Sequence, residues 1–198
     1  MQHCDRWSGQ TQGGLLRERD ATATKHQLLH AARRRFRFGA FNDVSLRDIA
    51  ADAGVDASLI SRYFGSKADI FREVVASVAP GTEIFEGERG DFGKRMAAAI
   101  FDDRQGDAFS DGVLIVMRAV GSEEALDIVR AAAATWTLLL EHWIGTPDQS
   151  ERAFIIRSIL MGICYERALR SPHDATGLDL ADLEARLAAL FQAQATVA

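Results

Sequence analysis

Residues 41–71, FNDVSLRDIAADAGVDASLISRYFGSKADIF, decide the fold. Ser45, with an aspartate three residues later, has the pattern of a capping box, which starts a helix. Gly54 supplies the permissive turn residue that ends this helix. Asp56 is expected to cap a second helix, and Gly65 to end it. Two short helices joined by a glycine-containing turn are typical of a helix-turn-helix.

Small and apolar side chains in this stretch are suited to hold the two helices against each other, with Ile49 and Ile60 at the centre. The remaining positions of the second helix form an expected outer face, suited to base edges and phosphates: Ala57, Ser58, Ser61, Arg62 and Tyr63. Lys67 opens the next helix, where a cation opposes the helix dipole, so we expect it to face a phosphate. On spacing alone, an ordinary helical hairpin with a solvated face remains the alternative.

Outside this stretch the periodicity is helical, and no segment alternates with the period of a strand. A helix is expected from Thr24 to the glycine at 39, and further helices at about 45–52, 57–64, 66–79, 91–103, 110–120, 122–144, 148–170 and 179–195. The fold class is therefore all-α, with about nine helices. We expect a flexible tail over 1–22, a helix-turn-helix domain over 23–70 and a helical effector-binding and dimerisation domain over 71–198.

Charge is distributed unevenly along the 198 residues, whose net charge is −5. Residues 1–70 hold 11 basic and 8 acidic residues, whereas residues 71–198 hold 12 basic and 20 acidic residues. A more basic N-terminal part points toward a polyanionic partner. No apolar run has the length of a membrane span or of a signal peptide, so we expect a cytoplasmic protein with no membrane partner.

The stretch from about Lys25 to Val75 closely resembles the DNA-binding domain of tetracycline-repressor (TetR) family regulators. The matching residues are Leu29, Ala31, Ala32, Phe36, Gly39, Ser45, Arg47, Asp48, Ile49, Ala50, Ala53, Gly54, Val55, Tyr63, Phe64, Ser66 and Lys67. The resemblance implies that Ser45 and Arg47 touch the DNA backbone or groove edge, that residues 57–63 form the recognition helix and that Lys67 grips a phosphate. Leu59 and Ser61 stand where the family often has Thr and usually has Tyr, so the operator sequence does not follow from the resemblance.

The part from about Gly90 onward matches the family in outline, as helices that follow the DNA-binding unit. The resemblance implies a homodimer that binds a double-stranded, pseudo-palindromic operator, blocks transcription and responds to a small-molecule effector. Small and apolar residues on the last two expected helices are candidates for the dimer interface: Phe154, Ser158, Gly162, Leu183, Leu187 and Leu190. The alternative is that both stripes pack within one chain.

An effector cavity is expected among aromatic and methionine side chains with a few polar neighbours. The candidates are Met117, Thr135, Trp136, His142, Trp143, Met161 and Tyr165, and they favour an apolar or aromatic, neutral or cationic molecule. Core packing is the alternative for each one. Arg118 and Arg130 would reverse the charge preference if either faced inward.

Other candidate sites in the sequence have less support from residue type and spacing. The basic run 33–37, RRRFR, either attracts phosphate or forms a solvated helix face. His26 and His30 lie four residues apart, but no further ligands follow at the right spacing, so no metal is expected. We find no catalytic motif and expect neither an enzyme nor a cofactor. The alternative to a DNA-binding regulator is an all-α small-molecule binding or stress protein with a vestigial helix-turn-helix.

Overall fold

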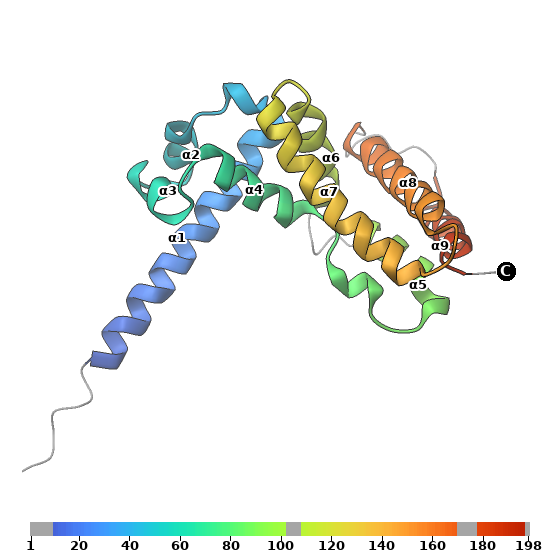
Figure 1. Ribbon diagram of the computed structural model, residues 1–198. Helices are drawn as coiled ribbons and strands as arrows, with labels where there is room; N and C mark the ends of the chain where they lie inside the picture. The colour runs from blue at the N-terminus through green and yellow to red at the C-terminus, as the bar shows by residue number, and fades with distance from the viewer. Residues whose placement is uncertain (1–9, 102–107, 170–177, 197–198) are drawn as a thin grey trace, which may run out of the picture.

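A computed structural model describes residues 10–101, 108–169 and 178–196 of the chain. These parts are helical and contain no strand (Figure 1). Their α-helices are α1 (Gln10–Phe38), α2 (Leu46–Asp52), α3 (Ser58–Tyr63), α4 (Lys67–Val78), α5 (Phe92–Phe101), α6 (Ala108–Ala119), α7 (Glu123–Ile144), α8 (Gln149–Leu169) and α9 (Leu180–Ala195). Short 3-10 turns at Phe41–Asp43, Thr82–Phe85 and Arg89–Asp91 connect some of them. The all-α fold class is confirmed.

The first helix is longer than the sequence analysis expected. Residues 10–22 were placed in a flexible tail, whereas in the structure they continue α1, whose first turns project from the body of the molecule (Figure 1). The segment has no proline, and Leu15 to Arg19 are good helix formers. Extending an existing helix needs no new nucleus, so the two glycines at 13 and 14 are tolerated. Residues 1–9 of the expected tail lie outside the described residues.

Local capping explains why the helix-turn-helix forms where the sequence places it. The Ser45 hydroxyl accepts the Asp48 N–H at 3.1 Å at the start of α2. Gly54 has φ +67°, a left-handed conformation that only glycine adopts without strain, and it turns the chain toward α3. Ser66 and Asp69 form a reciprocal capping box at the start of α4.

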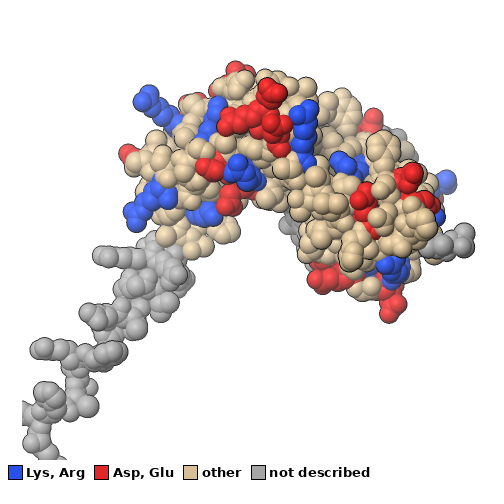
Figure 2. Space-filling model, in the orientation of Figure 1, with Lys and Arg blue, Asp and Glu red and all other residues tan. Residues whose placement is uncertain are grey.

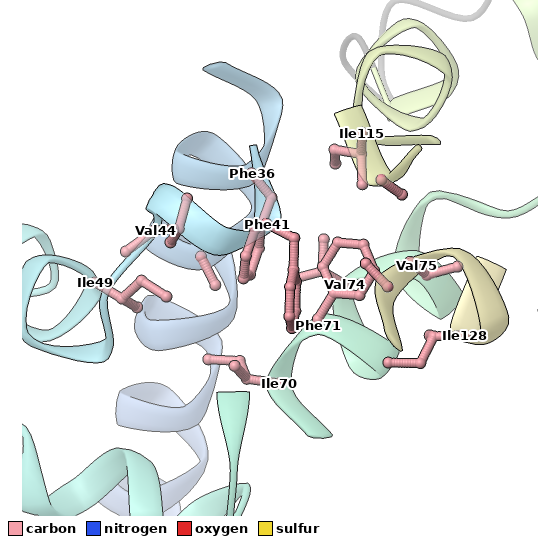
Figure 3. Packing of buried hydrophobic residues seen from close by; sticks show 14 of the residues in the cluster. Phe36, Phe41, Val44, Ile49, Ile70, Phe71, Val74, Val75, Ile115 and Ile128 are labelled. Carbon is pink, nitrogen blue, oxygen red and sulfur yellow. The ribbon is translucent and has the colours of Figure 1, made fainter. Parts of the chain in front are cut away.

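The first hydrophobic core joins the helix-turn-helix to the rest of the chain. Three aromatic rings lie at its centre, with the Phe71 centroid 4.8 Å from that of Phe36 and 5.0 Å from that of Phe41, both edge to face. Ile115 from α6 and Ile128 from α7 pack into the same cluster (Figure 3). The expected domain boundary at residue 70 therefore falls inside α4, and the core continues across it.

The second hydrophobic core is formed by α5, α6, α7, α8 and α9. Phe92 of α5, Leu140 of α7, Ile156 of α8 and Phe191 of α9 are all completely buried there. Gly93 permits the close approach of α5 to α9, because a Cβ at this position would lie 2.0 Å from the Ala188 carbonyl oxygen. This bundle lies beside the helix-turn-helix unit, with α4 between them (Figure 1). Within the described ranges, no helix is long and apolar enough to cross a membrane.

Candidate functional site

The polar face of the helix-turn-helix is largely exposed. Ser45 and Arg47 at the start of α2, and Ser58, Ser61 and Arg62 on α3, are exposed side chains. Figure 2 shows several Lys and Arg side chains on the side of the molecule where α2 and α3 lie. The other residues predicted for this face are half-buried, since Ala57 and Tyr63 pack against the first core. The structure thus divides the predicted DNA-binding set into five exposed residues and three that also support the fold.

Two arginines of the helix-turn-helix are free to bind an anion. Neither Arg47 nor Arg62 forms an ion pair with any residue that the structure describes. Both guanidinium groups are exposed, and they lie on consecutive helices of the motif. An unpaired guanidinium on an exposed helix is suited to bidentate contact with a phosphate.

Most of the basic run on α1 is engaged within the chain. Arg35 binds both carboxylate oxygens of Asp52 at 2.6 Å, which lowers the pKa of that carboxyl group through the hydrogen bonds it accepts. Arg33 and Arg37 contact the two oxygens of Asp111 on α6, at 2.8 and 2.9 Å. Three arginines of the run therefore attach α1 to α2 and α6, a role that the sequence analysis did not expect.

Lys67, which the sequence analysis expected to face a phosphate, is half-buried and engaged within the chain. Its ammonium group donates to the backbone carbonyls of Phe41 at 2.9 Å and Val44 at 3.2 Å. It also lies 4.5 Å from the centroid of the Phe41 ring. These contacts satisfy carbonyls in the connection between α1 and α2, and they account for a lysine at the first position of α4.

A cavity of about 210 Å³ lies between α4, α6, α7 and α8. Its lining is almost entirely apolar and includes Val75 and Val78 from α4, Gly112 and Val116 from α6, Ala132 and Trp136 from α7, and Arg157, Met161 and Cys164 from α8. Burial raises the pKa of the Cys164 thiol to about 11, so this group is uncharged at neutral pH. The cavity has the apolar character of a small-molecule site, and its volume suits a small ligand.

Of the predicted effector-binding residues, only Trp136 and Met161 line this cavity. Trp143 is instead stacked on Phe92 with ring centroids 4.5 Å apart, and its indole N–H donates to the Phe85 carbonyl at 3.2 Å. Met117, Thr135 and His142 are exposed. Tyr165 packs against the second core without lining the cavity. The aromatic and methionine content correctly indicated that the cavity lies in the helical bundle. It did not indicate which faces of the helices line this cavity.

The residues that the sequence analysis missed are the valines of α4, Gly112 and Arg157. A glycine inside the apolar run of α6, and an arginine flanked by isoleucines on α8, were the available signals. A Cβ on Gly112 would lie 3.2 Å from both the side chain and the carbonyl oxygen of Val78, so α4 and α6 approach closely beside the cavity. The preceding residue is Asp111, whose carboxylate binds Arg33 and Arg37 of α1. One short stretch of α6 thus contacts both the cavity and the N-terminal unit.

The residues predicted for dimerisation separate into exposed and buried groups. Phe154 and Leu190 are 69% and 52% exposed, and Ser158 and Gly162 are also exposed. Leu183 is half-buried against the second core. Leu187 is only 3% exposed and packs inside its own chain, so it offers no surface to a partner. On α9 the apolar side chains that pack within the chain lie beside the apolar side chains that are exposed. Helical periodicity alone did not distinguish the two groups.

No group of three or more His, Cys, Asp and Glu side chains that could hold a metal ion occurs in the described part of the chain.

Comparison with solved structures finds the same fold in other bacterial proteins. The repressor NalD of Pseudomonas aeruginosa, described as the secondary repressor of a multidrug efflux pump, superposes with a TM-score of 0.65 at 17% identity, over 87% of this chain and 96% of that one. A TetR-family regulator from a Rhodococcus species has a TM-score of 0.67 at 14% identity, over 88% and 100%. A TetR-family regulator from Streptomyces coelicolor is 22% identical over 98% and 100%, with a TM-score of 0.51. No curated protein sequence matches this chain.

Family models cover most of the sequence. Residues 28–74 match the model of bacterial regulatory proteins of the tetR family. Residues 90–194 match the model of the tetracyclin repressor-like C-terminal domain, which alone spans more than half of the chain. Together with the helix-turn-helix and the helical bundle that follows it, these matches show that the chain belongs to the TetR family of ligand-responsive, DNA-binding transcriptional regulators.

Proposed function

We propose that this protein is a homodimeric repressor that binds a pseudo-palindromic operator and releases it when an effector occupies the cavity between α4, α6, α7 and α8. The observation that carries the proposal is the position of α4. Its first half, with Ile70 and Phe71, lies in the core of the DNA-binding unit, and its last turns line the cavity at Val75 and Val78. One helix therefore contributes to both sites.

On the DNA side, Arg47 and Arg62 would bind phosphates, while Ser58 and Ser61 on α3 would face base edges. Ser45 is engaged with Asp48 at the start of α2 and would lie at the groove edge. Tyr63 and Lys67 would support this face from behind. The free cations give non-specific affinity, and the short serine side chains leave room for α3 to enter the major groove.

The dimer would form through the exposed apolar stripe of α8 and the exposed side of α9. Phe154, Ser158 and Gly162 lie at helical spacing on α8, and Leu190 lies on α9. A Cβ added at Gly162 meets nothing within 4 Å, so the surface is open to a close helix from a second copy. A two-fold arrangement of these helices would give a four-helix interface and two recognition helices for a symmetric operator.

Transmission of the effector signal would run through the contact between α4 and α6. A molecule in the cavity that displaces α6 from Val78 would also move Asp111, which holds Arg33 and Arg37 of α1. The effector then favours a conformation in which the recognition helices no longer match the operator, by a shift of population.

A titration of DNA binding against salt tests the DNA side. We expect Arg47→Ala and Arg62→Ala each to weaken binding to a mixed-sequence duplex and to reduce the slope of log affinity against log salt by about one, because each removes one phosphate contact. Arg130→Ala is the matched control, because Arg130 is an exposed arginine on α7, outside the helix-turn-helix and outside the proposed dimer helices. Equal slopes for all four proteins would show that this face does not bind DNA.

Sedimentation at micromolar concentration tests the dimer. We expect Phe154→Glu, or Gly162→Arg, to give a folded monomer, because each introduces a charge into the proposed interface without disturbing the chain's own core. Val120→Glu is the control, since Val120 is 68% exposed and lies outside the stripe. A dimer that survives both substitutions would place the interface elsewhere.

A further inference from the structure

Two polar side chains that line the cavity have no partner among the residues that the structure describes. The Trp136 ring is 92% buried, and its indole N–H has no hydrogen-bond acceptor among the described residues. Arg157 lines the same cavity and is half-buried, and its guanidinium forms no ion pair or hydrogen bond with any residue that the structure describes. A buried N–H in proteins nearly always has an acceptor, so the unmatched Trp136 indole N–H, in the same apolar lining as a cation without a counter-charge, points to an acceptor from outside.

Neighbouring side chains of the same types on α7 and α8 do have partners. Arg152, which also lies on α8, contacts the Asp148 carboxylate at 2.7 Å and the Thr196 carbonyl at 3.0 Å. The other tryptophan of α7, Trp143, donates its indole N–H to a backbone carbonyl. Arg118 and Arg130, which the sequence left as possible charges in the cavity, are exposed and bind the Arg37 carbonyl and Asp127. Arg157 is thus the one charged side chain that the described residues contribute to the cavity lining.

The rest of the lining sets what else the ligand can carry. Among the residues that the structure describes, no acidic side chain lines the cavity, and the Cys164 thiol is neutral. A cationic ligand would meet Arg157 without a counter-charge. A purely apolar ligand would cover the guanidinium and leave it unpaired. A ligand with several negative charges, such as a nucleotide, would bring more anionic groups than one arginine can match.

We propose that the cavity binds an apolar monocarboxylate, whose carboxylate is held by the Arg157 guanidinium and the Trp136 indole N–H while its hydrocarbon part fills the space between the valines of α4 and α6. A carboxylate supplies two acceptor oxygens, which suits the fork of a guanidinium and leaves an acceptor for the indole. This proposal differs from the neutral or cationic molecule that the sequence analysis favoured. Its regulatory meaning rests on the proposed function, but the binding chemistry does not.

Calorimetric titration of the full-length protein with octanoate, octanol and octylamine tests the head group, because the three share one hydrocarbon chain. We expect octanoate to bind about tenfold or more tightly than either of the others, since a charge-assisted contact forms only with the carboxylate. Hexanoate, decanoate and naphthoate extend the series to other sizes and shapes. Equal affinities for the three head groups, or no binding by any carboxylate at millimolar concentration, would overturn the proposal.

Substitutions at the two donors test the assignment of residues. We expect Arg157→Gln to reduce the preference for octanoate over octanol to within about threefold, and Arg157→Lys to keep most of it. Trp136→Phe, which keeps the ring but removes the N–H, should weaken octanoate several-fold and leave octanol unchanged. Arg130→Gln on α7 is the matched control. A full preference in Arg157→Gln, with thermal unfolding showing a folded protein, would remove Arg157 from the site.

Release of DNA separates this inference from the proposed function. If octanoate binds with the expected preference but does not release DNA, the cavity chemistry stands and the effector role fails. If other molecules release DNA and no carboxylate binds, the carboxylate proposal fails and the effector role stands.

Discussion

Replacing Asp111 with Asn should loosen the attachment of α1 to α6. The Asp111 side chain is only 9% exposed, and it accepts from Arg33 at 2.8 Å and contacts Arg37 at 2.9 Å. Breaking a fully buried ion pair by removing one partner costs about 3–5 kcal/mol. The two arginine side chains keep 23% and 28% exposure, so water takes up part of their charge, and Asn can still accept one hydrogen bond. We therefore expect a loss of about 1–3 kcal/mol in the free energy of unfolding.

Urea denaturation at one fixed protein concentration measures this loss, because urea does not screen charges and a dimer's stability depends on concentration. Asp127→Asn is the control, since its ion pair with Arg130 is exposed on both sides and should contribute less than about 0.5 kcal/mol. Arg33→Gln combined with Asp111→Asn should cost less than the sum of the single changes, as partners in one contact do. If Asp111→Asn cost no more than Asp127→Asn, the ion pairs would not stabilise the junction.

Three further predictions follow from the placement of single side chains. Lys67→Ala should lower the free energy of unfolding, measured by urea denaturation, by about 1–2 kcal/mol. It should leave the slope of log DNA affinity against log salt unchanged, and a slope lower by about one would show that Lys67 contacts a phosphate. In a Cys4→Ser background, the Cys164 thiol should react with iodoacetamide at pH 8 about a hundredfold more slowly than a thiol with the ordinary pKa of 9.0, because burial raises the pKa of Cys164 to about 11. Labelling at the ordinary rate would show that the thiol is exposed to solvent. In the monomeric Phe154→Glu background, Leu187→Ala should lower the free energy of unfolding by about 2–5 kcal/mol, and Leu190→Ala should lower it much less. Equal losses would contradict the finding that Leu187 is buried and Leu190 is exposed.

The sequence predicted the helix-turn-helix well because its ends are encoded locally. Ser45 and Ser66 bind backbone N–H groups a few residues away, and Gly54 alone permits the turn, so three positions determine where helices begin and end. The long helices of the bundle were predicted for a similar reason, since each has one apolar stripe. The start of α1 was missed because its sequence is polar and contains two glycines, so it has no helical periodicity to detect.

Contacts between distant segments were harder to predict. Periodicity says that Leu187 and Leu190 are apolar, but only the fold decides that the first is buried and the second exposed. Lys67 was assigned to DNA because its position suggested an anion, and the carbonyls it contacts lie more than twenty residues earlier. The partners of Asp111 lie at sequence separations of more than seventy residues, so no local pattern could indicate them.

Selection of DNA from a pool of random duplexes by the purified protein tests the central claim most directly. A two-fold symmetric dimer with exposed recognition helices should enrich an inverted repeat whose half-sites lie about one helical turn apart, or a multiple of it. The monomeric Phe154→Glu protein should enrich no such repeat, and Val120→Glu should enrich the same one as the unaltered chain. Enrichment of a single asymmetric site, or of no sequence at all, would contradict the account.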